Sequence, residues 1–366
     1  MRKIKSFIAI LFLSFLTIIF SCEKENKTIK EDTPPATTPY TAPVIANFRP
    51  MPVDAANPMT LEGIALGKRL FFDPILSKDS TISCASCHQQ QFSFSDDKIK
   101  SLGVNATQGK RNSMALINLA WQKNRFFWDG HANTLRQQAT FPIEDPIEMH
   151  LPLPTAVARL QKHADYVELF WKAFGTKIIS VDLLTKALEQ FENTLISYNS
   201  KYDLYVRMDQ PLTTSELNGL EIFKTEKGDC FHCHASAASE VFISPDRTFA
   251  NNGLDAVNSV FSFTDFGLGT FTRDTADYGR FKIPTLRNLA FTAPYMHDGR
   301  FATLDEVIDF YNAGPKLSPT LEPIMIEKAE KRMELFGRWG LGLTTQEKQD
   351  LKAFLLTLTD TTYIRQ

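Results

Sequence analysis

Two copies of one short motif constrain this chain more than any other feature. Cys84–His88 and Cys230–His234 both have the pattern Cys-x-x-Cys-His. At this spacing two thiols form thioether bonds to the vinyl groups of a haem, and the adjacent imidazole becomes an axial ligand of the iron. A zinc site needs four protein ligands together, and a redox disulfide belongs to a βαβ setting, so neither explains the histidine after each pair. The sequence therefore predicts two covalently bound haem c groups, held by Cys84, Cys87, His88, Cys230, Cys233 and His234.

Helical patterns precede both motifs and dominate the rest of the chain. An apolar-periodic segment runs from Thr60 to Phe71 before the first motif, and Thr213 with Glu216 forms a capping box that begins a helix before the second. Four further segments have helical periodicity, residues 160–174, 181–198, 303–311 and 345–358. Capping boxes begin the last two, Thr303 with Glu306 and Thr344 with Glu347. Strand-like alternation is scarce, and residues 235–285 read as long loops around the second haem. The predicted fold is mainly α, with two cytochrome-c-like helical domains that each carry a covalent haem and have long loops between them.

The N-terminus reads as an export signal. Three basic residues precede an apolar run from Phe7 to Phe20, which is too short to favour a permanent membrane span. Ile19–Cys22 resembles a bacterial lipobox, in which the Cys22 thiol is acylated and becomes the mature N-terminus. An ordinary signal peptide with an incidental cysteine is the alternative. We expect an exported lipoprotein, anchored to a membrane by its lipid on the periplasmic side.

Composition divides the chain into four predicted segments. Residues 1–22 are the signal peptide, and residues 23–45, with almost no large apolar groups, are a disordered tether. Residues 46–205 are expected to form the N-terminal cytochrome c domain, and residues 206–366 the C-terminal one. The net charge of −2, without a long basic run outside the N-terminus, argues against a nucleic-acid partner.

Further short motifs follow in order after about residue 57. They are Leu66–Ser77, Arg111–Asn112, Phe127–Gly130, Pro142-Ile143 with Glu148-Met149, Pro284–Asn288 and Ala293–Gly299. Together with the two haem motifs, their order and spacing resemble those of the bacterial di-haem cytochrome c peroxidase family, which includes MauG, the di-haem enzyme of methylamine dehydrogenase maturation. The resemblance implies that the N-terminal haem reacts with hydrogen peroxide and that the C-terminal haem relays electrons.

The resemblance also implies an open iron face at the first haem. Many members place a second histidine opposite the axial one, but here no histidine lies between His88 and His131. His131 stands where the family usually has arginine, and we do not assign it as a ligand. By their spacing from Trp128, Gln138 and Glu148 match the family's distal pair, in which the carboxylate moves a proton during O–O cleavage and the amide orients the peroxide. From composition alone, Glu148 would be a surface residue.

Trp128 and Tyr311 gain their expected roles from the same resemblance. Trp128 matches the tryptophan between the two haems, where an indole can carry electrons, although it also fits a core aromatic. Tyr311 occupies the helix position at which many members carry a methionine ligand of the second haem and the MauG branch carries tyrosine. A phenolate ligand is hard and anionic, and therefore stabilises high oxidation states of iron. Met296 is the rival ligand, and a purely structural Tyr311 is the remaining alternative.

The resemblance implies one more cofactor and several partners. Asn112, Thr292 and Pro294 match residues around the family's inter-domain calcium, for which backbone carbonyls are suitable ligands. The expected partners are hydrogen peroxide and either a small redox donor, a cytochrome c or a cupredoxin, or an unidentified protein substrate. A di-haem electron carrier without peroxide chemistry is the main alternative function, and it would require two six-coordinate irons. A redox or gas sensor would be expected to carry a signalling domain.

Overall fold

The structure is a computed structural model that describes residues 33–52, 54–122, 125–234, 242 and 248–362. Residues 34–366 form one compact unit. The predicted signal peptide, Cys22 and the first part of the predicted tether lie outside the described residues. Among the helices within the described ranges, none combines the length and the apolar composition that a membrane span requires.

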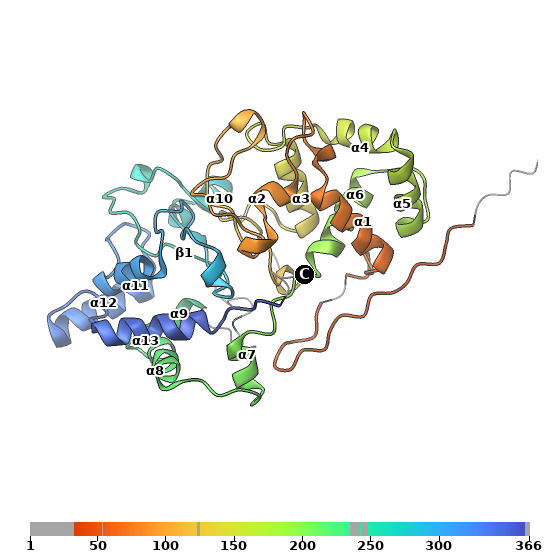
Figure 1. The fold of residues 1–366 in the computed structure, drawn as a ribbon. Coiled ribbons are helices and arrows are strands. Elements are labelled where there is room, and N and C mark those ends of the chain that lie inside the picture. Colours follow the sequence, from red (N-terminus) through yellow and green to blue (C-terminus); the bar gives the residue numbers. More distant parts are fainter. Residues whose placement is uncertain (1–32, 53, 123–124, 235–241, 243–247, 363–366) are drawn as a thin grey trace, which may run out of the picture. The chain divides into compact units, whose positions relative to one another are not determined.

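The N-terminal half of the compact unit contains six described α-helices (Figure 1). Their buried apolar side chains form the main hydrophobic core of this half. The helices are α1 (Leu61–Phe72), α2 (Cys84–Cys87), α3 (Leu135–Glu144), α4 (Leu153–Gln161), α5 (Ala164–Phe174) and α6 (Val181–Glu192). Helix α1 packs closely against α6, because a Cβ atom at Gly67 would collide with the carbonyl of Ala187. The buried side chains of this core include Leu66, Leu70 and Phe71 of α1.

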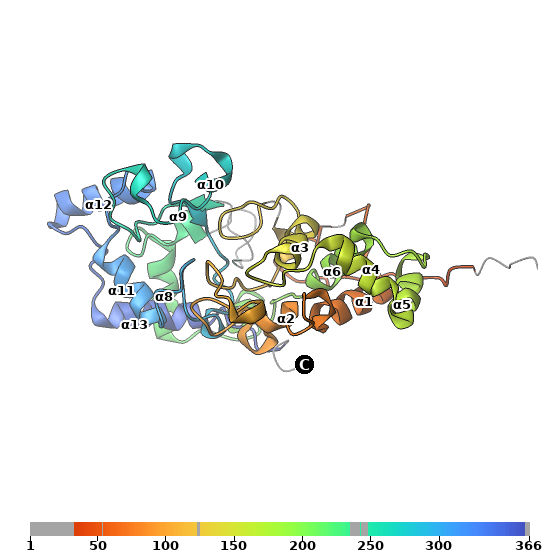
Figure 2. The same cartoon turned by 90° about the horizontal axis from the view of Figure 1, so that it is seen from above.

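The C-terminal half contains seven described α-helices and a second core (Figures 1 and 2). They are α7 (Lys201–Val206), α8 (Thr214–Lys224), α9 (Phe231–His234), α10 (Gly269–Thr272), α11 (Leu304–Ala313), α12 (Pro323–Phe336) and α13 (Thr345–Leu356). Helix α8 packs against α13 in the way that α1 packs against α6, since a Cβ atom at Gly219 would collide with the carbonyl of Asp350. In both halves, therefore, the helix before the haem motif uses a glycine for close helix packing.

Short elements complete the described fold. Strands β1 (Phe249–Ala250) and β2 (Phe281–Lys282) pair antiparallel, with Phe249 opposite Lys282. The 3-10 helices are η1 (Pro74–Leu76), η2 (Gln90–Phe92), η3 (Val104–Ala106), η4 (Leu119–Trp121), η5 (Val260–Ser262), η6 (Thr275–Asp277) and η7 (Leu289–Phe291). The predicted mainly α fold is confirmed.

Most predicted helices are present, with different ends. The capping boxes that begin α8, α11 and α13 are formed as predicted. The predicted helix over residues 160–174 is wrong as one element, because the chain turns at Lys162 and His163 between α4 and α5. The predicted helix over residues 181–198 ends instead at Glu192. Beyond α6 the chain pairs with Asn118, whose amide group donates to the carbonyl oxygen of Ser197 and accepts from its N–H.

The folded unit begins before the predicted boundary at residue 46. The N–H of Tyr40 donates to the carbonyl oxygen of Met59 at 2.9 Å, and the N–H of Thr38 donates to the Glu62 carboxylate at 2.8 Å. Ile45 is buried in a small cluster with Trp121. Residues 38–45, which composition assigns to the tether, therefore contact the N-terminal half.

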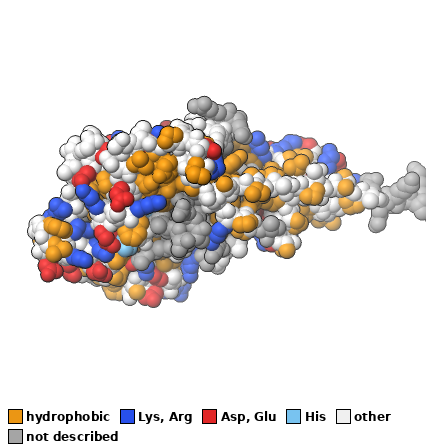
Figure 3. All heavy atoms as spheres, turned by 90° about the horizontal axis from the view of Figure 1, so that it is seen from below, with side chains coloured by type: hydrophobic (Ala, Val, Ile, Leu, Met, Phe, Trp, Pro, Cys, Tyr) orange, Lys and Arg blue, Asp and Glu red, His pale blue; other side chains and the backbone are white. Residues whose placement is uncertain are grey.

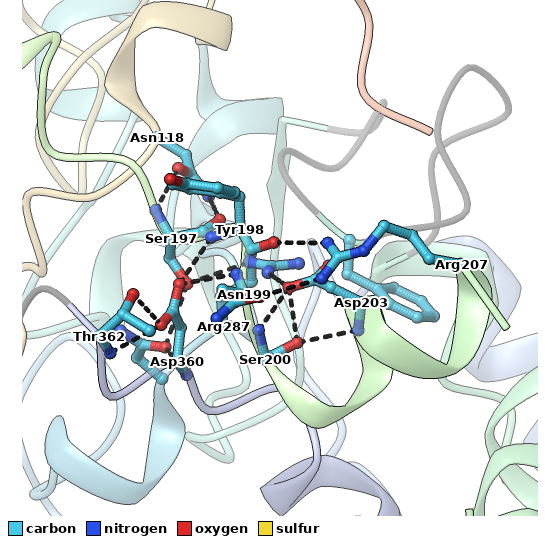
Figure 4. A network of polar contacts seen from close by, with 12 residues as sticks. Asn118, Ser197, Tyr198, Asn199, Ser200, Asp203, Arg207, Arg287, Asp360 and Thr362 are labelled. Atoms are coloured by element: carbon cyan, nitrogen blue, oxygen red, sulfur yellow. Dashed lines mark hydrogen bonds and ion pairs between the residues drawn. The ribbon is translucent and has the colours of Figure 1, made fainter. Parts of the chain in front are cut away.

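A buried polar network connects the segment after α6 to the C-terminal end of the described chain (Figure 4). The Asp360 carboxylate accepts the backbone N–H groups of Tyr198 and Asn199, each at 2.8 Å. Nearby, the guanidinium of Arg287 is fully buried and forms an ion pair with Asp203. Buried charges are tolerated only when they are paired and hydrogen-bonded, and the Arg287–Asp203 pair meets this condition. The bonds from Asp360 to the segment after α6 connect the two halves.

The face shown in Figure 3 has no large patch of side chains with the same charge. Lys and Arg side chains are interspersed with Asp and Glu, with hydrophobic side chains between them. Clustered basic side chains are typical of nucleic-acid binders. On this face basic and acidic side chains are mixed, in line with the small net charge of −2.

Candidate haem and peroxide site

One large cavity brings both Cys-x-x-Cys-His motifs together. Its volume is about 1590 Å³, and its walls include Cys84, Cys87, His88, Cys230, Cys233 and His234. Pockets for single small molecules span roughly 300–1,000 Å³. The cavity is therefore larger than one such ligand requires, and it reaches both predicted attachment sites.

The first motif is arranged as haem attachment requires. Cys84 and Cys87 lie on the short helix α2 and form no disulfide. The Nδ1 atom of His88 lies 2.9 Å from the carbonyl oxygen of Phe94 and donates to it. This bond fixes the tautomer and leaves Nε2 as the ligand atom. Burial lowers the pKa of His88, which keeps the imidazole in the neutral form that binds metals.

The second motif has the same character. Cys230 and Cys233 are unbridged thiols, and burial raises the pKa of Cys230 to about 12. Burial lowers the pKa of His234 to about 4, so this imidazole is also neutral at physiological pH. Four free thiols, two half-buried neutral histidines and one shared cavity fit two covalently attached haems.

Glu148 lies in the turn after α3, in the wall of the same cavity as Cys84 and Cys87. Its backbone is fixed, because its carbonyl oxygen accepts the N–H of Val104 at 2.8 Å. Burial, with a smaller contribution from the charge of Asp145, raises the pKa of Glu148 to about 7. Gln138 of α3 lines the cavity as well. The structure thus brings the predicted distal pair and the first haem motif together around a carboxyl group that changes charge near neutral pH.

Trp128 is held by residues from both halves. Its Nε1–H donates to the carbonyl oxygen of Asn112 at 2.9 Å, and its own carbonyl oxygen accepts the N–H of Lys282 in β2 at 2.8 Å. Its side chain lies in the wall of the cavity that both motifs share. This is the placement expected for an aromatic group between two haems.

His131 belongs to an aromatic stack in the cavity wall. Its ring lies 4.1 Å from that of Phe127 and 4.7 Å from that of Phe271, in near-parallel planes. Its Nδ1 lies 2.6 Å from the Asp129 carboxylate, which also pairs with Arg111. The imidazole is therefore fixed by stacking and by a hydrogen bond to Asp129.

Tyr311 and Met296 both line the cavity near the second motif. Tyr311 lies in the last turn of α11, and burial raises its pKa to about 12. The Nδ2–H of Asn252 donates to Tyr311 Oη at 3.0 Å, and the same nitrogen lies 3.8 Å from Met296 Sδ. The structure thus brings both rival ligands within reach of one amide group. Sequence analysis missed Asn252, for which the only local signal is an Asn-Asn-Gly turn.

Two buried ionisable groups in the cavity wall were not predicted either. Lys282 is 8% exposed, and burial lowers its pKa to about 8. Glu192, at the end of α6, is 4% exposed, and burial raises its pKa to about 8. Strong shifts of this kind are frequent at functional sites. The sequence carries no signal for them, because both shifts arise from tertiary burial.

The residues matched to calcium lie in the wall of the cavity, and one of them, Asn112, contacts Trp128. Asn112, Thr292 and Pro294 all line the cavity. The backbone N–H of Asn112 donates to the carbonyl oxygen of His297 at 2.8 Å, which connects the two halves. A calcium ion at these residues stays a prediction, for which backbone carbonyl oxygens would be suitable ligands.

Comparison with known proteins gives the same family as the motifs. A family model described as di-haem cytochrome c peroxidase matches residues 61–211. The methylamine utilization protein MauG of Methylorubrum extorquens is 35% identical over 312 residues, which cover 84% of this chain and 81% of that protein. The chain belongs to the di-haem cytochrome c peroxidase family. This family assignment confirms the predicted resemblance, the oxidoreductase class and the two c-type haems that a di-haem family implies.

Further relatives cover both branches of the family. The cytochrome c551 peroxidase of Nitrosomonas europaea is 35% identical over 265 residues, which cover 72% of this chain and 77% of that enzyme. Among solved structures, a MauG-like protein associated with microbial copper homeostasis superposes with a TM-score of 0.78 at 34% identity, over 89% of this chain and 97% of that one. The individual roles of Glu148, Gln138, Trp128 and Tyr311 stay predictions.

Proposed function

We propose that this chain is a peroxidase that reduces hydrogen peroxide at the His88 haem with electrons relayed through the His234 haem. The observation that carries this proposal is Glu148, whose carboxyl group lines the cavity beside the first haem motif and has a pKa raised to about 7. A general base works best when its pKa lies near the working pH. An ordinary surface glutamate would be fully ionised there and would return a proton poorly.

The residues around the first haem have separate proposed roles. When bound, haem supplies the electron chemistry of peroxide reduction. The Glu148 carboxylate takes one proton from hydrogen peroxide and returns it to the other peroxide oxygen, which leaves as water when the O–O bond breaks. Gln138 orients the peroxide through its amide group. Phe94 holds His88 through the Nδ1–H bond, and so keeps in one orientation the imidazole that would bind the iron.

Electron flow between the two haems is assigned to Trp128. The indole lies in the wall of the shared cavity, and hydrogen bonds from both halves fix the residue. We propose that Tyr311 would hold the iron of the second haem together with His234, which would make this chain MauG-like. The hydrogen bond from Asn252 supports this choice, because it directs a donor at the phenol oxygen.

The remaining assignments are part of the same proposal. We propose that Asn112, Thr292 and Pro294 hold a calcium ion, and that Cys22 is lipidated so that the enzyme is anchored on the periplasmic side of a membrane. The partner is a small redox donor, a cytochrome c or cupredoxin, or an unidentified protein substrate. The MauG relatives support the second possibility and the cytochrome c peroxidase relatives support the first.

A peroxide titration of the haem-loaded, fully oxidised protein tests the proposal. We expect rapid conversion to a long-lived oxidised species without added reductant, which would support both the open His88 iron and the Tyr311 ligand. A reaction only after one-electron reduction would retain the peroxidase and remove the MauG-like part. If neither redox state reacts, the chain is a di-haem electron carrier and the proposal fails.

A further inference from the structure

Asn252 occupies a turn that is fixed from both sides. The preceding residue, Asn251, is buried, and its amide group donates to Ser318 Oγ and Thr320 Oγ1, each at 3.0 Å. The Oδ1 atom of Asn251 accepts the N–H of Gly253 at 3.0 Å. The carbonyl oxygen of Gly253 in turn accepts the N–H of Lys316 at 2.9 Å. These bonds hold the backbone on each side of Asn252, so its side chain points in a set direction.

Met296 and Tyr311, the two residues that the Asn252 amide contacts, are also fixed in position. Met296 has φ +75°, which is unusual for a residue with a side chain and persists only where the surroundings enforce it. Its turn is closed by the N–H of Tyr295, which donates to the carbonyl oxygen of Phe301 at 2.8 Å. Tyr311 is held in the last turn of α11, where the N–H of Gly314 donates to its carbonyl oxygen.

The Asn252 amide makes a closer contact with Tyr311 than with Met296. Its Nδ2 lies 3.0 Å from Tyr311 Oη, a normal hydrogen bond, but 3.8 Å from Met296 Sδ, a longer contact with a weak acceptor. The amide N–H occupies one lone pair of Oη. The O–H of the neutral phenol, or the free lone pairs of the phenolate, must therefore point in another direction. Tyr311 contributes to the cavity wall together with His234, and the oxygen is therefore available on the cavity side.

We propose that Asn252 is a positioning residue that selects the axial ligand of the second haem, holding the Tyr311 oxygen toward the iron in preference to the Met296 sulfur. This inference rests on the proposed function, in which Tyr311 is a ligand. A hydrogen bond to an oxygen that carries negative charge is stronger than one to a neutral acceptor. Loss of the donor therefore weakens the tyrosine ligand, whereas a thioether sulfur gains little from the same amide and loses little without it.

The test compares five single variants of the haem-loaded full chain, one of them a control, at one pH. Asn252→Leu and Asn252→Asp both remove the donor, and the second keeps the size of the side chain. Tyr311→Phe removes the phenol oxygen, and Met296→Leu removes the sulfur. Tyr295→Phe is the matched control, because Tyr295 lines the same cavity but donates its hydroxyl to the carbonyl oxygen of Leu289 at 2.7 Å.

The readouts are electron paramagnetic resonance, the sulfur-to-iron charge-transfer absorption of a His–Met haem, and the reduction potential of the second haem. In the Asn252 variants we expect the ratio of tyrosine to methionine ligation to fall about tenfold, as loss of a hydrogen bond to a charged oxygen implies. The potential should rise at the same time, because methionine ligation raises it. Adding Met296→Leu to Asn252→Leu should abolish the sulfur absorption, and Tyr295→Phe should leave all three readouts unchanged.

The outcomes separate this inference from the proposed function. If Tyr311→Phe leaves the spectrum of the second haem unchanged, tyrosine ligation fails, and the inference fails with it. If Tyr311→Phe changes the spectrum while both Asn252 variants, with two haems per chain, keep the spectrum and the potential of the unaltered protein, Asn252 does not select the ligand. In that case the proposed function stands and the inference is overturned.

Discussion

Replacing Glu148 by glutamine should change activity and stability in opposite directions. As the proton-transfer group, Glu148 is expected to contribute about 10²–10⁴-fold to the rate of peroxide reduction, so Glu148→Gln should lose activity of that order. In the unaltered enzyme, kcat/KM should rise with pH through about 7, because the carboxyl group accepts a proton only when it is ionised.

The stability change follows from the same raised pKa. The carboxyl group has an ordinary pKa of 4.5 and a pKa of about 7 in the folded protein. Below pH 4.5 it is protonated in both the folded and unfolded states and contributes nothing. Between these values the unfolded chain releases the proton while the folded protein keeps it, so the free energy of unfolding falls as pH rises. With 1.36 kcal/mol for each tenfold change in proton affinity, the loss above pH 7 is about 3 kcal/mol.

Glu148→Gln removes this penalty. The variant should match the unaltered protein in the free energy of unfolding at pH 4 and exceed it by up to about 3 kcal/mol at pH 8. Denaturant unfolding at the two pH values, combined with steady-state peroxide reduction, measures both effects. The matched control is Glu144→Gln, four residues earlier at the exposed end of α3, which should change neither quantity. If Glu148→Gln and the unaltered protein are equally stable at pH 8, the pKa of Glu148 is not raised in the folded protein. If the activity is unchanged, Glu148 does not transfer the proton.

Three further predictions concern the cofactors and the packing. The double variant Cys230→Ala with Cys233→Ala should carry one covalent haem instead of two, measured as the haem-to-protein ratio after denaturation; two covalent haems would contradict the attachment site. Arg287→Leu should lower the free energy of unfolding by about 3–5 kcal/mol, because it leaves the Asp203 carboxylate buried without its ion pair; a loss below 1 kcal/mol would show that the carboxylate is not isolated. Gly219→Ala should cost about 1–3 kcal/mol through collision of its Cβ with the Asp350 carbonyl, and an unchanged midpoint of unfolding would show that α8 and α13 can move apart.

The sequence predicted those features that depend on interactions between residues close together in the chain. The haem motifs and the three capping boxes each lie within a few residues, and all three boxes are formed. The end of α6 was not predictable in this way, because the groups that replace its helical hydrogen bonds belong to Asn118, far earlier in the chain. Helix α12 was missed for a related reason. Only Ala329 among its residues is buried, so it has no apolar stripe.

The candidate site shows the same division. Resemblance to a family placed Glu148, Gln138, Trp128 and Tyr311, and Met296 was the rival ligand; the structure gathers all five around one cavity. The residues that tune these groups were not predicted. Asn252 depends on a contact across 59 positions of the chain, and the pKa shift of Lys282 depends on burial alone. Such effects arise when distant segments exclude water together, and a single sequence does not record which segments do so.

The two haem motifs suggest two separable domains, but the contacts of the first axial ligand involve both halves. The carbonyl oxygen of Phe94 accepts the Nδ1–H of His88, and the neighbouring Ser93 accepts a hydrogen bond from the Asn288 amide at 2.9 Å. Asn288 in turn contacts Ser197 of the polar network. Because a metal-bound imidazole takes its orientation from the group that its second nitrogen binds, the position of the C-terminal half contributes to the placement of His88. If peroxide reacts at the first haem, as proposed, the reaction therefore depends on residues that neither half supplies alone.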